Sequence, residues 1–103
     1  MRVVVLSDIH ANLPALQAVL ADVARTAPGA PIWHCGDVVG YGASPNEVVA
    51  ELQRVGATGV MGNHDLAALG DDVIDTFNEA AHAAALWTRD VLTAESRGWL
   101  RAL

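Results

Sequence analysis

Short apolar runs alternate with longer amphipathic segments along this chain. Arg2–Leu6 is a β-branched run bounded by polar residues, which predicts a strand buried on both faces. Two further short runs, Ile32–Cys35 and Thr58–Met61, are each followed by a glycine. They predict a second and a third strand, because glycine interrupts regular structure. The pattern therefore predicts three short strands separated by longer segments.

The segments between these runs have the apolar spacing of helices. Apolar residues recur at helical spacing from Leu13 to about Thr26, with Asn12 as the N-cap. Ser44–Glu47 has the spacing of a capping box with proline in the first turn, and it begins a second helix that ends at Gly56. Each predicted helix thus connects two predicted strands.

The remainder of the chain is predicted to be helical. A three-then-four spacing predicts a third helix with one long apolar stripe, formed by Val73, Phe77, Ala80, Ala84, Trp87 and Val91. Thr93 is expected to cap a last short helix ending near Leu103. The order strand, helix, strand, helix, strand is typical of parallel strands joined by right-handed crossovers. We therefore predict an α/β fold, a parallel βαβαβ sheet with flanking helices, in a single domain of residues 1–103.

Composition and charge narrow the classes of function. The 103 residues are 52% hydrophobic, which is enough for one packed core. The net charge of −6 makes the surface a poor match for bulk nucleic acid. The apolar run before Ser7 is too short for a signal peptide or a membrane span. The single cysteine, Cys35, allows no intrachain disulfide, so we expect a small core residue and a cytoplasmic protein.

Three clusters of polar residues each follow one of the predicted strands. They are Asp8-Ile9-His10, Gly36-Asp37 and Gly62-Asn63-His64-Asp65. Ligands of parallel α/β sheets bind beyond the carboxyl ends of the strands. The fold therefore predicts that these three clusters, although distant in sequence, meet at one edge of the sheet.

The residue types in these clusters are typical of a two-metal centre. Asp8 and His10 lie two apart, so in an extended segment both side chains can bind one ion. Asp37 could bridge two ions and Asn63 offers an amide oxygen, a donor set that suits Mn, Fe, Ni or Zn better than Ca. His64 lies next to a ligand and could protonate a leaving oxygen. Two divalent ions held in this way would favour hydrolysis of phosphate esters.

The three clusters together resemble the first three motifs of the calcineurin-like metallophosphoesterases. The loop Gly36–Gly42 and the helix start Ser44–Glu47 further resemble the small bacterial and archaeal phosphodiesterase branch of that family. The resemblance implies half of an αββα sandwich and two divalent ions, with Mn²⁺ favoured. It also implies the same roles for Asp8, His10, Asp37, Asn63 and His64 as the residues themselves suggest.

Two departures from the family pattern qualify the resemblance. Gly40 and Tyr41 stand where the protein serine/threonine phosphatases of the superfamily carry an Asp and an Arg, which argues against a protein phosphatase. Histidines occur only at positions 10, 34, 64 and 82, so the late Gly-His-x-His motif of the family is missing. We therefore expect an amino-terminal half whose remaining ligands are absent and which binds metal weakly by itself.

Some residues and one further function are left open at this point. Asn12 could contact substrate, although its capping role is enough to explain it. His34 is expected to be partly buried and hydrogen-bonded and not a ligand. The expected partner is a small phosphate-ester substrate, without a membrane, and a homo-oligomer is left open. The alternative to an enzyme is a non-catalytic metal-binding fragment or remnant that self-associates through an exposed, tryptophan-bearing apolar surface.

Overall fold

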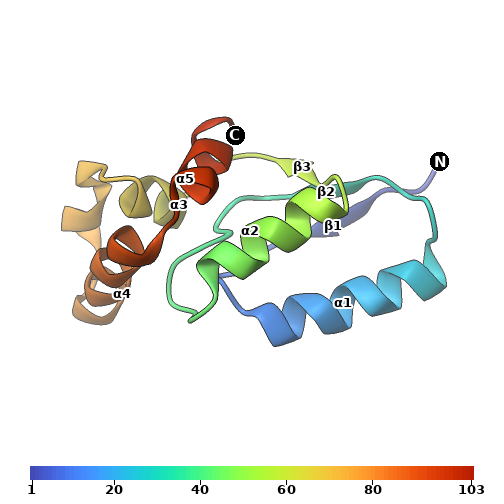
Figure 1. The fold of residues 1–103 in the computed structure, drawn as a ribbon, viewed down its shortest axis with the longest axis horizontal. Helices are drawn as coiled ribbons and strands as arrows, with labels where there is room; N and C mark the ends of the chain where they lie inside the picture. Colours follow the sequence, from blue (N-terminus) through green and yellow to red (C-terminus); the bar gives the residue numbers. More distant parts are fainter.

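Three parallel strands form the sheet of this protein. The computed structural model describes residues 1–103, and Figure 1 shows the chain running from the strands at its amino end to a group of helices. The strand order is β1-β2-β3, with bounds Val4–Leu6, Ile32–His34 and Thr58–Gly59. Both pairings are parallel, with Val5 opposite Trp33 and Trp33 opposite Thr58. The predicted parallel βαβαβ arrangement is confirmed.

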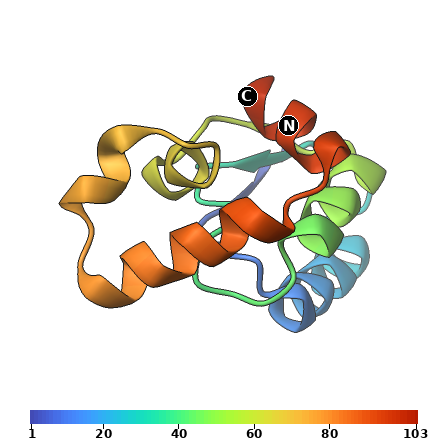
Figure 2. The ribbon, with the colours of Figure 1, turned by 60° about the vertical axis from the view of Figure 1, so that its left-hand side comes forward.

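The two crossover helices cover one face of this sheet. They are α1, Leu13–Thr26, and α2, Pro45–Arg54, and Figure 2 shows them side by side on the same side of the strands. The main apolar core lies beneath them and contains Leu16 and Leu20 of α1 with Val48 and Leu52 of α2. This core also receives Leu100 from α5, Ala94–Arg101. No helix in the structure has both the length and the apolar character that crossing a membrane requires.

The other face of the sheet is open, which contradicts the prediction of a first strand buried on both faces. Val5 is 59% exposed and Trp33, its partner in register, is 49% exposed. Cys35 is also exposed, so the prediction that it is a small core residue is wrong. The apolar run of β1 predicted two covered faces because sequence alone does not reveal that α1, α2 and α5 all pack on one side.

The predicted third helix is wrong at its start and in its buried face. Residues from Asp72 to Thr76 form a separate 3₁₀ helix, η1, and the α-helix α4 spans Glu79–Val91. Asn78 caps α4 by accepting a hydrogen bond from the backbone N–H of Ala81. This cap breaks the helical register, so the residues packed inward are one position removed from the predicted stripe. They are Ala81, Ala85 and Thr88.

A short helix that the sequence did not predict begins inside the third polar cluster. This helix, α3, spans Asn63–Ala68 and follows Gly62, whose backbone is extended. It is too short to give an apolar period, so the sequence pattern does not predict it. The predicted cap of α2 lies at the right residue, but the side chain of Ser44 makes no capping hydrogen bond. The cap of α1 is as predicted, since Asn12 Oδ1 accepts from the backbone N–H of Ala15.

Candidate metal centre

The loops that leave β1 and β2 are joined to each other by backbone hydrogen bonds. His10 N–H donates to the carbonyl of Asp37 at 2.9 Å, and Ala11 N–H donates to the carbonyl of Val38 at 2.8 Å. In return, the N–H of Gly42 donates to the carbonyl of His10 at 3.0 Å. Two segments that are distant in sequence are thereby fixed against each other at the carboxyl edge of the sheet. This contact brings the first two polar clusters together, as the sequence predicted.

These loops contain every non-glycine residue of the chain that has a positive φ. The residues are Asp8, His10, Ala11, Asp37 and Tyr41, with φ between 45° and 62°. Left-handed backbone is unfavourable for residues with a Cβ, and it persists only where surrounding contacts impose it. Concentrated strain of this kind is typical of binding and catalytic sites.

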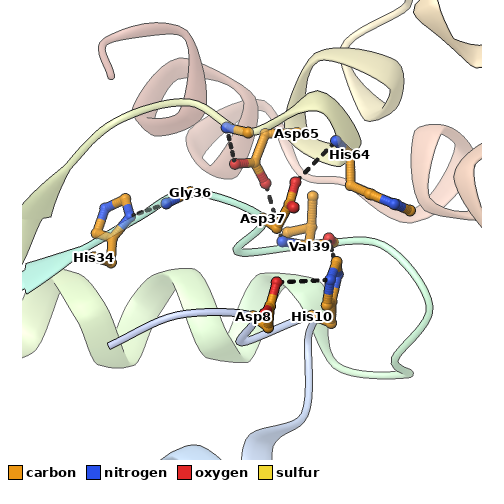
Figure 3. A network of polar contacts seen from close by, with 9 residues as sticks. Asp8, His10, His34, Gly36, Asp37, Val39, His64 and Asp65 are labelled. Carbon is orange, nitrogen blue, oxygen red and sulfur yellow. Dashed lines mark hydrogen bonds and ion pairs between the residues drawn. The ribbon is translucent and has the colours of Figure 1, made fainter. Parts of the chain in front are cut away.

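Asp8, His10 and Asp37 present their ligand atoms to a common point. One ligand atom from each lies within 4.8 Å of the other two. The Nδ1 of His10 lies 3.1 Å from the carbonyl oxygen of Val39, which fixes Nδ1 as the protonated nitrogen. Its Nε2 is therefore free to coordinate, and it lies 3.6 Å from Oδ1 of Asp8 (Figure 3). The three side chains fit a divalent cation in distance, donor type and tautomer.

No arginine neutralises the two carboxylates of this group. The ion pairs that involve arginine are Arg25 with Asp22 and Arg54 with Glu51, both on the surfaces of helices. Asp8 faces only Nε2 of His10, which is unprotonated when Nδ1 donates to the carbonyl of Val39, and Asp37 forms no ion pair. Adjacent carboxylates without a cationic partner repel each other, and a bound cation removes this repulsion.

Asp37 also connects the first two clusters to the third. Its Oδ1 accepts a hydrogen bond from the backbone N–H of His64 at 3.0 Å (Figure 3). A Cβ on Gly62 would lie 2.2 Å from the same oxygen and 2.4 Å from the backbone nitrogen of Asp37, so only glycine allows this approach. Asn63 follows directly as the exposed first residue of α3. All three clusters therefore lie at one edge of the sheet.

Asp65 is buried beneath the site and holds the second and third loops together. Its two oxygens accept from the backbone N–H of Val39 at 3.1 Å and of Gly62 at 3.0 Å. Burial raises the pKa of Asp65, while these backbone hydrogen bonds oppose the increase. Asp65 belongs to the third polar cluster, but the motif alone does not predict this structural role. Its position three residues after the helix cap Gly62, where an acidic side chain can accept from the cap N–H, could have indicated one.

The imidazole of His64 lies among aromatic rings near the ligand group. Its centroid is 4.9 Å from that of His10, 4.8 Å from Tyr41 and 4.6 Å from Phe77. Burial lowers the pKa of His64 below its usual value, with His10 adding to the decrease and Asp37 opposing it. Without substrate, the ring is therefore predominantly neutral near neutral pH. Phe77 lies outside all three motifs, and the sequence pattern places it only in the apolar stripe of the predicted third helix.

A cavity of about 660 Å³ opens beside the ligand group. Its lining includes Asp8, His10, Asn12, Tyr41 and Ser44. The predicted contact residue Asn12 is therefore next to the site as well as capping α1. A larger cavity, of about 780 Å³, lies between the carboxy-terminal halves of α1 and α2 and contains none of the predicted site residues. The smaller cavity is the candidate site because the possible metal ligands Asp8 and His10 line it.

His34 is buried but is not part of the ligand group. It is 3% exposed, and its Nδ1 accepts a hydrogen bond from the backbone N–H of Gly36 at 3.2 Å. Burial lowers the pKa of His34, with Asp65 opposing the decrease. The expectation of a buried, hydrogen-bonded histidine without a ligand role agrees with this position.

Comparison with known proteins identifies a family for this chain. A family model described as calcineurin-like phosphoesterase matches residues 1–101. An uncharacterized protein of Methanocaldococcus jannaschii, MJ0912, is 43% identical over 101 residues. A crystal structure of a metallophosphoesterase from Sphaerobacter thermophilus is 40% identical with a TM-score of 0.77. The structure of the hypothetical protein PH1004 from Pyrococcus horikoshii is 25% identical with a TM-score of 0.84.

These similarities extend over the chain but not over the whole of the other proteins. The chain is matched over 98% of its length by MJ0912, of which it covers 41%. It is covered completely by the Sphaerobacter thermophilus structure, of which it covers 41%, and it covers 47% of PH1004. The chain thus spans less than half the length of the relatives it matches.

Proposed function

This chain belongs to the calcineurin-like phosphoesterase family, and we propose that the protein hydrolyses phosphodiester or small phosphomonoester bonds with two divalent metal ions. The family and the group Asp8, His10 and Asp37 support phosphoesterase chemistry at a candidate metal site. The activity, the substrate class, the number of ions and the roles of individual residues are the proposal.

The proposed ligands are Asp8 and His10 for the first ion, Asp37 between both ions, and Asn63 for the second ion. The 4.8 Å grouping of the first three residues and the free Nε2 of His10 support this assignment. When bound, such ions neutralise charge on the phosphoryl group and provide a nucleophile at neutral pH. Mn²⁺ is the favoured ion, with Fe, Ni or Zn as alternatives, because carboxylate and imidazole donors suit all of them.

His64 is the proposed general acid for the leaving oxygen. General-acid action requires the imidazolium form, and burial lowers the pKa of His64 in the free protein. A phosphate anion close to the ring favours imidazolium and raises this pKa. As the ester P–O bond breaks, Nε2 would transfer this proton to the leaving oxygen, and the ring would be left neutral.

The proposed substrate is a small phosphate ester that enters the 660 Å³ cavity beside Asn12. The net charge of −6 argues against bulk nucleic acid as a substrate. We place the reaction in the cytoplasm, because a chain with one cysteine forms no internal disulfide.

The observation that carries the proposal is the convergence of Asp8, His10 and Asp37. Its test compares hydrolysis of an aryl phosphodiester in the presence of Mn²⁺ by the native protein and by Asp37→Asn. Asparagine adopts left-handed backbone as readily as aspartate, so the variant removes the negative charge without straining the loop. We expect hydrolysis to fall about 100-fold or more, with weaker Mn²⁺ binding by calorimetry.

Asp22→Asn is the matched control, because Asp22 is an exposed aspartate on α1 that pairs only with Arg25. It should keep the native rate. Equal rates for the native protein and Asp37→Asn would refute the proposed metal centre.

The second candidate function is a non-catalytic metal-binding chain that self-associates. The observation that favours it is the open sheet face, where Val5 and Trp33 are about half exposed and adjacent in register. Light scattering combined with calorimetric Mn²⁺ titration separates the two candidates. Self-association that Trp33→Ser abolishes, without hydrolysis of any aryl phosphoester, would support this second function. Two tight metal sites in a monomer would contradict it.

A further inference from the structure

The imidazole of His64 is held by packing and not by a hydrogen bond. The Phe77 ring is stacked on it, with centroids 4.6 Å apart and planes inclined by 30°. His10 meets it edge-on at 79°, and Tyr41 lies at an inclination of 39°. The side chain of His64 forms no hydrogen bond, and its contact with Asp37 is made by the backbone N–H alone. Aromatic contacts therefore define the orientation of the ring.

The backbone of Gly40 packs against Nδ1 of the His64 ring. A Cβ on Gly40 would lie 2.8 Å from Nδ1 of His64, so the glycine backbone packs directly against that edge. Nδ1 is buried and has no hydrogen-bond partner, whereas Nε2 is not among the buried unpaired atoms. A proton on Nδ1 of the neutral ring would be a buried donor without an acceptor, which is unfavourable. Of the two neutral tautomers, this packing favours the one with its proton on Nε2, the nitrogen that is not buried. The imidazolium, which proton donation requires, carries a proton on both nitrogens and donates from Nε2.

Phe77 is itself fixed by the helices of the carboxy-terminal part. It lies between η1 and α4 and packs against a small buried cluster of Ala67, Ile74 and Ala85. These three residues come from α3, η1 and α4, so the ring of Phe77 rests on a surface built by three elements. Because this support is rigid, it can hold the Phe77 ring, and the His64 ring stacked on it, in a fixed position.

We propose that Phe77 is a positioning residue that, together with Gly40, orients His64 with Nε2 available to the leaving group. The catalytic purpose of this orientation rests on the proposed function, whereas the packing of the His64 ring does not depend on it. Where a catalytic histidine has a carboxylate partner, a hydrogen bond to Nδ1 sets its orientation and tautomer. Here Gly40 occupies the position next to Nδ1, and a stacked aromatic ring performs the orienting task instead.

The first test observes the ring of His64 directly in the intact protein. The side chain of His64 is followed by NMR with labelled histidine, and its signals are identified by their loss in His64→Gln. The stacked Phe77 shields the carbon-bound protons of His64, so they should appear upfield of those of His82, which has no aromatic contact. Phe77→Leu should move these signals downfield and mix the two tautomers, and Phe77→Tyr should restore the native pattern.

Ile74→Val is the matched control, because Ile74 belongs to the same buried cluster and has no aromatic ring to stack on His64. It should loosen the cluster slightly and leave the signals of His64 unchanged. The proposal is overturned if Phe77→Leu leaves the signals of His64 in place, or if Ile74→Val moves them as far.

The second test uses the basicity of the leaving group. A p-nitrophenyl diester has a weakly basic leaving oxygen and needs little help from an acid, whereas an unsubstituted phenyl diester needs more. Phe77→Leu should lower kcat for the phenyl ester about tenfold more than for the p-nitrophenyl ester, and Phe77→Tyr should recover it. Equal losses on the two esters would contradict a positioning role.

The two proposals fail in distinguishable ways. If His64→Ala loses no more activity on the phenyl ester than on the p-nitrophenyl ester, the acid role of His64 fails. The NMR comparison of Phe77→Leu with Ile74→Val would still decide whether Phe77 orients the ring.

Discussion

The two ends of the sheet use left-handed backbone in opposite ways. At the carboxyl end, Asp8, His10 and Asp37 adopt positive φ although each carries a side chain. At the amino end, the turns after α1 and α2 place only Gly29 and Gly56 in this conformation. A Cβ at either glycine would meet nothing within 4 Å. The amino end is therefore open and relaxed, whereas the carboxyl end is crowded and strained.

The difference indicates where residues adopt a backbone conformation that their own side chains disfavour. A glycine at Asp8 or Asp37 would relieve backbone strain but would remove a carboxylate. Cross-loop hydrogen bonds, such as that from His10 N–H to the carbonyl of Asp37, hold the strained residues in place. Proteins accept such conflicts at functional sites and stabilise them through neighbouring contacts.

The largest expected effect compares one glycine from each end. Gly62→Ala would bring a methyl group to 2.2 Å from Oδ1 and 2.4 Å from the backbone nitrogen of Asp37. We expect the free energy of unfolding to fall by about 3 kcal/mol, with loss of Mn²⁺ binding. Gly29→Ala, which meets no neighbouring atom, should cost only about 1 kcal/mol, for its positive φ. Chemical denaturation measures both, and equal losses would remove the contrast between crowded and open ends.

An intermediate effect compares two buried alanines. Ala11 and Ala85 are both 1% exposed, but Ala11 has a φ of 56° and Ala85 lies in helix α4. Ala85→Gly should cost about 2 kcal/mol, from lost helix propensity and a lost methyl group. Ala11→Gly should change stability by less than about 0.5 kcal/mol, because relief of left-handed strain offsets the loss of the buried methyl group. A cost at Ala11 as large as that at Ala85 would show that the loop is not strained.

The smallest expected effect is on pH dependence, and it concerns His34 at the carboxyl end of β2. Burial lowers the pKa of His34 below its unfolded value of 6.5, and Asp65 offsets part of this decrease. Below pH 6.5 the unfolded chain therefore binds more protons than the folded chain. The stabilising contribution is complete above that pH and is lost as the pH falls through the folded pKa. His64, whose pKa is also lowered by burial, acts in the same direction.

Thermal unfolding at about pH 7 and about pH 5.5 measures this dependence. His34→Gln should reduce the loss of Tm on acidification, and the part due to His64 should remain. His82→Gln, on α4, is the matched control and should keep the native dependence. If His34→Gln and the native protein lose the same Tm, burial of His34 does not contribute to acid sensitivity.

Much of the fold and the placement of the candidate site could be predicted from the sequence. The strands and the first two helices follow from local apolar spacing, and parallel topology then places Asp8, Asp37 and Asn63 at one edge. The cap at Asn12 was predictable because an N-cap depends only on nearby residues. The family assignment was available from the same three clusters. The chemical roles of the residues and the single-domain organisation stay predictions.

The features that could not be predicted depend on contacts between distant segments. Val5 is exposed because three helices pack on the other side of the sheet, a fact that no local pattern contains. The apolar spacing is continuous across Asn78, so the pattern predicts one helix where the structure has η1 and α4. The stacking of Phe77 on His64 joins a residue outside the motifs to one inside them. Local spacing carries no information about such pairs.

The backbone hydrogen bonds between the two ligand loops have a consequence for cation selectivity. Ordering a residue costs about 1–2 kcal/mol of backbone entropy, and here folding orders His10 and Asp37 together. A cation therefore binds to loops that folding has already ordered, so ordering the loops reduces its affinity little. The ranking of divalent ions should then follow their intrinsic preference for carboxylate and imidazole donors, with little contribution from how easily the polypeptide adapts to ionic radius.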